Sequence, residues 1–170
     1  MARPPATRST RRRSSARALS TNAIDMLRAD HKAVEAMFRQ FDKLHEAGED
    51  TATVIQFVRE ALLIHSALEQ EIFYPAVRER AGEEEEELLD EAEVEHQSAE
   101  QLIRALGSRK LSDKKREATF TVLMEYVRHH VKEEEIEMFP KVKRLKRVNL
   151  DAVGAQMEQR KASLLKKALG

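Results

Sequence analysis

Apolar residues recur at every third or fourth position along four long stretches of the chain, and a shorter fifth stretch follows. This is the spacing of amphipathic helices, and glycines and polar loops separate the stretches. The expected helices run from about 22 to 47, from about 51 to 80, from about 84 to 106, onward from Ser112, and from about 150 to 167. The pattern predicts an all-α fold, an up-down-up-down four-helix bundle with a short C-terminal fifth helix.

The chain of 170 residues divides into three expected parts. Residues 1–21 are rich in Arg, Ser, Pro and Thr and offer little to bury, which predicts a disordered basic tail. Residues 22–148 form the bundle, and residues 149–170 form the last helix, which packs on it. The tail is Arg-rich and acid-free like an organelle transit peptide, so organelle import is the alternative to the cytoplasmic location that we expect.

Four histidines interrupt the apolar stripes, one on each long helix, and they belong to a repeat of 65 residues. The offset relates His31 to His96, His65 to His130, Glu35 to Glu100, Glu69 to Glu134 and Pro75 to Pro140. In H-x-x-x-E the two side chains are four residues apart and therefore share one helix face. The two halves resemble copies of one helical hairpin.

Helix lengths place the four histidines at one level of the bundle. His31 and His65 are 34 residues apart, as are His96 and His130. About fifteen residues up, a loop of about four and fifteen down return a hairpin to the same height, at ~1.5 Å per residue. The chain between His65 and His96 turns near Gly82, so we expect the two hairpins to be level with each other.

A single histidine on an apolar stripe is most simply a hydrogen-bonded core residue, but four level histidines with two stripe glutamates indicate another kind of site. A buried carboxylate without a partner is costly, and a metal ion offsets that cost. Dinuclear sites in helix bundles are built from histidines and carboxylates that converge from four helices. The alternative is a buried His–Glu hydrogen-bond network that the repeat carries without metal.

The ligand types narrow the choice of metal. The chain has no cysteine, which excludes thiolate zinc sites and iron–sulfur clusters. Imidazole and carboxylate suit iron, manganese or zinc. Four imidazoles and two bridging glutamates fill roughly eight of the twelve positions of two six-coordinate ions. The others are open to oxo, hydroxo, water, dioxygen or peroxide, or to two further candidate ligands, Glu35 and Glu100.

Charge is unevenly distributed along the chain although the net charge is zero. Residues 1–22 carry +6 and residues 141–170 carry +7, whereas residues 23–140 carry −13. The acidic central segment is more typical of a cation-binding protein than of a nucleic-acid-binding protein, so we do not expect nucleic acid as a partner. No apolar run approaches the ~18–20 residues that a membrane-spanning helix needs.

Two stretches resemble a known family. The segments from His65 to Pro75 (HSALEQEIFYP) and from His130 to Pro140 (HVKEEEIEMFP), each preceded by an isolated helix histidine, are similar to the hemerythrin-like, or HHE cation-binding, domain. The resemblance covers about residues 22–145. It implies a four-helix bundle that binds two oxo- or hydroxo-bridged iron ions, with manganese or zinc less favoured, and takes dioxygen, peroxide or nitric oxide as small ligands. The implied metal ligands are His31, His65, Glu69, His96, His130 and Glu134.

One position departs from the oxygen carriers of this family, which have a second histidine four residues after the one on the third helix. Here that position is Glu100. An added carboxylate favours ferric iron and argues against reversible dioxygen carriage. We therefore expect a protein that senses or handles dioxygen, reactive oxygen species or iron.

Two other functions are left open by the sequence. The first is a di-iron catalase- or peroxidase-like enzyme, in which peroxide binds the open metal positions. The second is a non-enzymatic interaction module whose metal site is only structural. No nucleophilic triad or phosphate-binding loop is evident, so we do not expect an enzyme unless the site consumes peroxide.

Features next to the candidate ligands carry weaker expectations. Pro75 and Pro140 lie inside predicted helices and should kink them, because proline lacks the N–H that the preceding turn uses. Phe73, Tyr74 and Phe139 are predicted to pack around the site. A redox role for Tyr74 is the alternative to a core tyrosine.

Overall fold

The structure is a computed structural model that describes residues 22–168, all of them in helices or the loops that join helices. The bounds are α1 (Ala23–Ala47), α2 (Ala52–Leu68), η1 (Glu69–Phe73), α3 (Tyr74–Arg78), α4 (Glu83–Leu106), α5 (Asp113–Glu133), η2 (Glu134–Met138), α6 (Phe139–Arg144) and α7 (Leu150–Ala168). The disorder predicted for the N-terminal tail concerns residues 1–21, which lie outside the described part of the chain.

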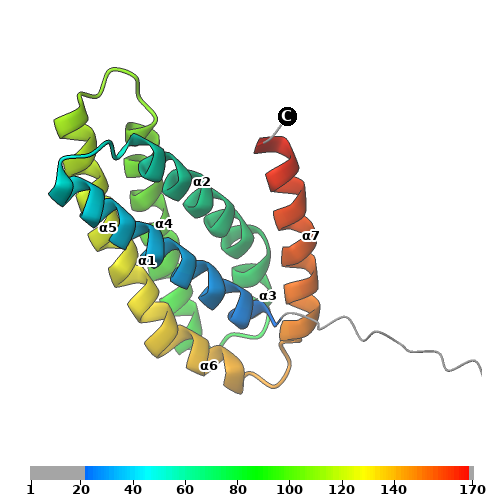
Figure 1. The fold of residues 1–170 in the computed structure, drawn as a ribbon. Coiled ribbons are helices and arrows are strands. Elements are labelled where there is room, and N and C mark those ends of the chain that lie inside the picture. Colours follow the sequence, from blue (N-terminus) through cyan, green and yellow to red (C-terminus); the bar gives the residue numbers. More distant parts are fainter. Residues whose placement is uncertain (1–21, 169–170) are drawn as a thin grey trace, which may run out of the picture.

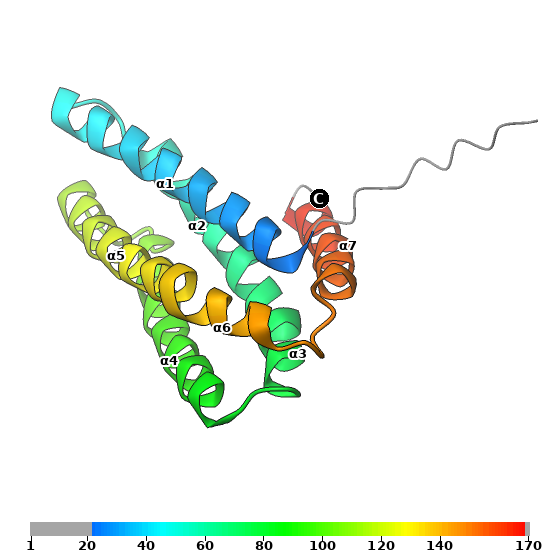
Figure 2. The ribbon, with the colours of Figure 1, turned by 90° about the horizontal axis from the view of Figure 1, so that it is seen from below.

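The helices form four antiparallel rods and one added helix (Figures 1 and 2). α2, η1 and α3 follow one another without a break and make one rod, and α5, η2 and α6 make another. α1 packs against α2, and α4 packs against α5, so each half of the chain is a hairpin. α7 lies against α1 and α2 and leaves α4 and α5 uncovered on that side. The predicted up-down-up-down bundle with a fifth helix is confirmed.

Local sequence signals set the ends of the rods. The side chain of Asn22 accepts a hydrogen bond of 3.1 Å from the Ile24 N–H and caps α1. Gly48 ends the same helix at φ 69°, a left-handed conformation that favours glycine. Five consecutive glutamates open α4, and the charge of the four in its first turn complements the helix dipole. These signals fix the length of each rod and thereby the level of its histidine.

Both proline-containing rods have a wide turn where the sequence predicted a kink. η1 and η2 are π-helical turns, in which the N–H of Tyr74 bonds to the carbonyl of Glu69 and that of Phe139 to Glu134. Pro75 and Pro140 then occupy the start of α3 and α6, where the missing N–H has no helical partner to lose. Each rod therefore continues through its proline.

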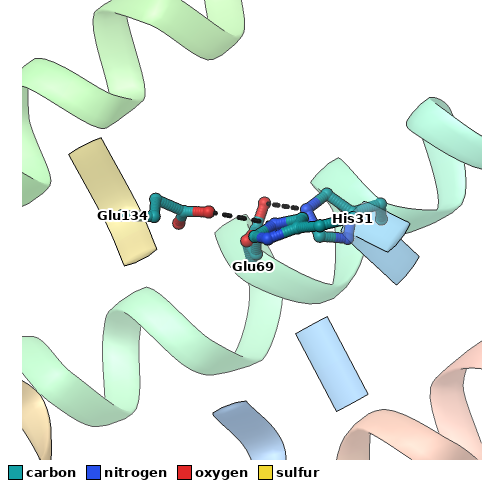
Figure 3. A group of neighbouring side chains, drawn as sticks. His31, Glu69 and Glu134 are labelled. Atoms are coloured by element: carbon teal, nitrogen blue, oxygen red, sulfur yellow. Dashed lines mark ion pairs between the residues drawn. The ribbon is translucent and has the colours of Figure 1, made fainter. Parts of the chain in front are cut away.

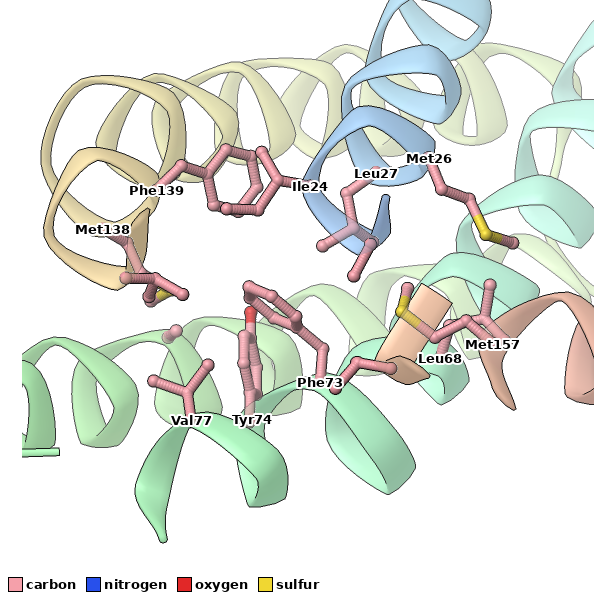
Figure 4. Packing of buried hydrophobic residues seen from close by; sticks show 14 of the residues in the cluster. Ile24, Met26, Leu27, Leu68, Phe73, Tyr74, Val77, Met138, Phe139 and Met157 are labelled. Carbon is pink, nitrogen blue, oxygen red and sulfur yellow. The ribbon is translucent and has the colours of Figure 1, made fainter. Parts of the chain in front are cut away.

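The apolar interior has two parts, one on each side of the histidine level. One cluster gathers around Ile24, Leu27, Phe73, Phe139 and Met157 (Figure 4). The other gathers around Phe38, Phe41, Val58, Leu106 and Phe120. On each rod the histidine lies between residues of the first cluster and residues of the second. No helix within residues 22–168 is long and apolar enough to cross a membrane.

Candidate metal centre

All six residues that the resemblance implies as ligands lie together at the middle of the bundle. His31, His65, Glu69 and Glu134 each offer one donor atom within 4.8 Å of the others, and Glu69 does so again with His96 and His130. Figure 3 shows the carboxylate of Glu134 directed at His31, with Glu69 beside them. The two groups of donors share Glu69, which is the arrangement that two neighbouring cations need.

Each glutamate approaches one histidine of its own helix and one of the other hairpin. Glu69 Oε2 is 3.1 Å from His65 Nε2 and 3.3 Å from His96 Nε2. Glu134 Oε2 is 3.6 Å from His130 Nε2 and 3.3 Å from His31 Nε2. The 65-residue repeat of the sequence is thus a near two-fold symmetry of the site, with both carboxylates between the hairpins.

Five of the inward-facing donor atoms lack hydrogen-bond partners, whereas His96 Nε2 and His130 Nε2 lie 3.0 Å from each other. This difference tests the metal-centre hypothesis against the hydrogen-bond network. Glu69 is 0% exposed and Glu134 is 1% exposed. Both oxygens of Glu69, Glu134 Oε2, His31 Nε2 and His65 Nε2 are buried without a hydrogen bond. A hydrogen-bond network would have satisfied these atoms, whereas cations among them would satisfy all of them at once. The donor set therefore fits a metal centre.

Each imidazole turns its other nitrogen, Nδ1, outward to a second side chain. The pairs are His31 with Glu135 (3.0 Å), His65 with Asp30 (3.7 Å), His96 with Ser66 (2.7 Å) and Gln70 (3.1 Å), and His130 with Glu95 (2.8 Å). Metal-binding histidines usually have such an outer partner, which fixes the ring and its tautomer. All four Nε2 atoms are consequently aimed at the centre.

Mutual attraction of opposite charges dominates the electrostatics of the cluster. Burial would lower the pKa of His65, but the carboxylates of Glu69 and Asp30 raise it to about 10. Burial would also lower the pKa of His130, and Glu134 and Glu95 raise it to about 9. Burial would raise the pKa of Glu69, but the adjacent imidazoles hold it well below its ordinary value. The buried carboxylate of Glu69 is therefore anionic and ready for a cation.

Tyr74 contacts the candidate ligands directly. Its sequence position predicted packing around the site but not these hydrogen bonds. Its hydroxyl donates a hydrogen bond of 3.0 Å to Glu134 Oε1 and lies 3.1 Å from His96 Nε2. Burial, followed by the charges of Glu134 and Glu69, raises the pKa of Tyr74 well above its ordinary value. Its proton therefore stays on the oxygen and holds one carboxylate of the centre.

The two further candidate ligands lie outside both groups of donors. Glu35 pairs with Arg128 at 3.1 Å and with Arg39 at 3.5 Å. Glu100 pairs with Arg104 at 2.6 Å and accepts a hydrogen bond of 3.4 Å from Gln70. The structure thus brings six of the eight candidate residues together and directs these two glutamates to arginines.

The outer partners were missed by the sequence reasoning, although the repeat contains a signal for them. Asp30 and Glu95 are 65 residues apart. Asp30 faces His65 and Glu95 contacts His130, in each case the histidine on the second helix of the same hairpin. Gln70 and Glu135 are also 65 residues apart, and each serves a histidine of the other hairpin. The same 65-residue offset, applied to every polar position beside the candidate ligands, would have found these four outer partners.

Neither a curated protein nor a solved structure matches the chain. A family model does match, and it is described as the hemerythrin HHE cation binding domain. Its match covers residues 22–142, which hold all four histidines, both buried glutamates and the two π-helical turns. The chain belongs to the hemerythrin HHE cation-binding domain family.

Proposed function

We propose that this protein binds two iron ions without heme and senses or handles dioxygen, reactive oxygen species or iron. One observation carries the proposal. Four imidazole Nε2 atoms and two fully buried carboxylates converge in two groups of donors that share Glu69, and most of these atoms have no hydrogen bond. Nitrogen and oxygen donors without sulfur favour iron over softer metals, and manganese or zinc is the alternative.

The residues divide into two metal positions. His31, His65 and Glu134 would hold one ion, His96 and His130 the other, and Glu69 would lie between them. Once bound, two iron ions supply one-electron redox chemistry and open positions for small ligands. The chain orients the imidazoles through their outer partners and keeps a proton on Tyr74 beside the shared carboxylates.

Metal analysis tests the proposal directly. Protein from iron-replete cells should contain about two irons per chain, and its optical spectrum should change between the anaerobic and the oxidised state. Zinc or manganese in place of iron would keep the site and change its chemistry. A sum near zero for all three metals would overturn the proposal.

Peroxide turnover separates the sensing or handling role from the enzymatic alternative. A catalase- or peroxidase-like centre must consume hydrogen peroxide over many cycles without losing its iron. We expect the purified holoprotein to react with peroxide about once per centre and then stop. Sustained turnover that disappears in Glu134→Gln would instead favour the enzyme.

Glu100 tests the expectation of poor dioxygen carriage. The centre lacks an imidazole at this position, and Glu100 turns to Arg104, so one metal position has fewer nitrogen donors than in the oxygen carriers. We expect oxygen to oxidise the reduced protein irreversibly, and Glu100→His to slow this autoxidation by adding a donor one turn from His96. Gln97→His, on the exposed side of α4, is the matched control. Full recovery of the colourless reduced protein under argon, over repeated cycles, would contradict the expectation.

A further inference from the structure

A cavity of about 510 Å³ lies directly beside the four imidazoles, between α1, α2, α4 and α5. His31, His65, His96 and His130 all line it and form its inner end. Its exposed lining residues come from α1 and from the rod made of α5 and η2, so it opens to solvent between α1 and this rod. The metal centre therefore communicates with solvent through a space that the chain itself encloses.

The size and walls of the cavity do not suit dioxygen or peroxide alone. A water-sized molecule occupies roughly 30 Å³, and cavities of about 300–1,000 Å³ typically hold organic ligands. Five carboxylates line the cavity, and each is paired with a basic or imidazole side chain: Asp30 with Lys161, Glu35 with Arg128, Glu95 with His130, Glu100 with Arg104, and Glu135 with His31. The buried wall away from the imidazoles is apolar and consists of Val34, Phe38, Leu62, Ile103 and Val127. An apolar lining of this kind favours a hydrocarbon group over a sugar or a nucleotide.

The length of the cavity limits the length of that group. Its lining on α1 extends from His31 to Phe38, and its lining on α4 extends from His96 to Ile103. Seven residues of helix span about 10 Å. A saturated chain of roughly eight to ten carbons, bonded at about 1.5 Å and extended in a zigzag, has a similar length.

Four basic side chains border the opening of the cavity. Lys32 and Arg39 border it from α1, and Arg128 and Lys132 border it from α5. Glu35 crosses the opening and pairs with both arginines. Both lysines are exposed, and neither makes an ion pair within the described residues. Two positive charges are therefore available to an anionic group at the mouth.

We propose that this cavity binds a medium-chain fatty acid, with the carboxylate at Lys32 and Lys132 and the acyl chain along the apolar wall toward Phe38. The chain fills the space between Phe38 and the histidines, and the head group stays at the solvent boundary. The site is formed by the protein chain alone, so the proposal goes beyond the metal function and does not depend on it.

Calorimetric titration of the metal-loaded protein with sodium decanoate tests the proposal. We expect one binding site per chain, weaker binding of hexanoate, and at least tenfold weaker binding of decyltrimethylammonium, whose head group has the opposite charge. The double variant Lys32→Glu, Lys132→Glu should weaken decanoate binding at least tenfold. Lys114→Glu, Lys115→Glu, at the far end of α5, makes the same change in net charge and should bind normally.

A wall variant tests where the acyl chain lies. Ala99 lines the cavity from α4, so Ala99→Phe should fill it and abolish decanoate binding, whereas Ala105→Phe on the exposed side of α4 should not. Circular dichroism verifies that each variant folds. Absence of decanoate binding, equal binding of the cationic amphiphile, or binding that neither the lysine nor the wall variant weakens would overturn the proposal. The same titration of metal-free protein separates this result from failure of the metal centre.

Discussion

The outward nitrogen of each central imidazole faces a second side chain, and these partners make the two halves of the centre unequal. Glu135, Asp30 and Glu95 provide a carboxylate behind three of the four rings. His96 instead has the hydroxyl of Ser66 and the amide of Gln70. A carboxylate partner makes an imidazole a stronger donor. The metal position that contains His96 should therefore bind its ion less tightly than the other.

The buried glutamates should couple metal content to stability. Replacing Glu69 or Glu134 by Gln removes an anionic candidate ligand while keeping the side-chain shape, and Glu69 is the one that lies between the two metal positions. We expect each variant to retain fewer than two metals per chain. Binding at about 100-fold above the dissociation constant stabilises a fold by about 2.7 kcal/mol, so most of the metal-dependent gain in melting temperature should disappear.

Glu137→Gln is the matched control because Glu137 lies in the same π-helical turn as Glu134 and is exposed. It should keep both the metal and the melting temperature. Metal analysis and thermal denaturation with and without metal measure the effect. A glutamine variant with full metal content and an unchanged melting temperature would show that the carboxylate does not bridge.

Metal uptake should release protons, because the raised pKa values mean that two imidazoles are charged in the metal-free protein. His65, with a pKa of about 10, and His130, with a pKa of about 9, both carry a proton at pH 7. Each must lose it to bind an ion, so affinity should fall as the pH falls, by about tenfold per pH unit for each released proton. Titrations in two buffers of different ionisation enthalpy count these protons.

The metal-free fold should show the opposite trend. A raised pKa stabilises the folded state below the unfolded value of 6.5, and this stabilisation is lost as the pH rises toward 9 and 10. Metal-free protein should thus become less stable between these limits while its affinity for metal increases. Metal binding without proton release would indicate that the imidazoles are already neutral.

The inward residues could be predicted from sequence because they replace apolar residues on the helix stripes at repeated positions. His31 and Glu69 are obvious exceptions to an apolar face. Asp30 and Gln70 do not stand out in this way, because polar residues are expected beside an apolar stripe. Only their short distances to the imidazoles in the structure distinguish them from other surface residues. Sequence patterning therefore selected the candidate ligands, which the structure brings together, and left their outer partners unassigned.

At the scale of elements, the π-helical turns decide which aromatic residues reach the centre. In such a turn the fifth residue, not the fourth, completes the turn. Tyr74 therefore lies above Glu69, and Phe139 lies above Glu134, where it stacks on His31 with ring centroids 5.9 Å apart. A helical period of 3.6 residues does not place these side chains on the ligand face, so periodicity alone does not predict the hydrogen bond between Tyr74 and Glu134.

The last helix is linked to the centre through the half-buried carboxylate of Asp30. Lys161 of α7 lies 2.5 Å from Asp30, and Asp30 in turn faces His65 Nδ1. Arg160 also binds Glu71 of η1 through two hydrogen bonds of 2.6 and 2.8 Å. α7 thus holds the wide turn that begins with Glu69 and orients the carboxylate behind His65.

Lys161→Met should weaken metal binding without removing any ligand. Loss of an outer partner typically costs about 10–100-fold in metal affinity, and Lys161 acts one contact further away. We expect Asp30→Asn to fall in that range and Lys161→Met to fall near its lower end, as measured by competition with a chelator. Lys166→Met, on the exposed end of the same helix, is the control. If Lys161→Met loosens α7 but binds metal normally, the lysine only anchors the helix.

At the scale of the whole molecule, the two hairpins meet across the metal centre. Helix packing is closest within each hairpin, between α1 and α2 and between α4 and α5. Glu69 reaches His96, and Glu134 reaches His31, so the shared carboxylates connect one hairpin to the other. Between α1 and α5 lies the cavity, whose opening is crossed by the ion pair of Glu35 and Arg128.

Metal removal should therefore loosen the association of the hairpins around the centre more than the hairpins themselves. Without cations, five buried donor atoms at the junction have no hydrogen bond, and local opening that hydrates them becomes less costly. We expect amide hydrogen exchange to increase at least tenfold across residues 27–38 and 127–139 on metal removal. Residues 113–123 contribute Phe120 and Leu123 to the second apolar cluster, lie away from the candidate ligands, and should change little. A uniform increase along the chain would mean that the metal stabilises the fold globally, and no increase would mean that the apolar clusters alone hold the hairpins together.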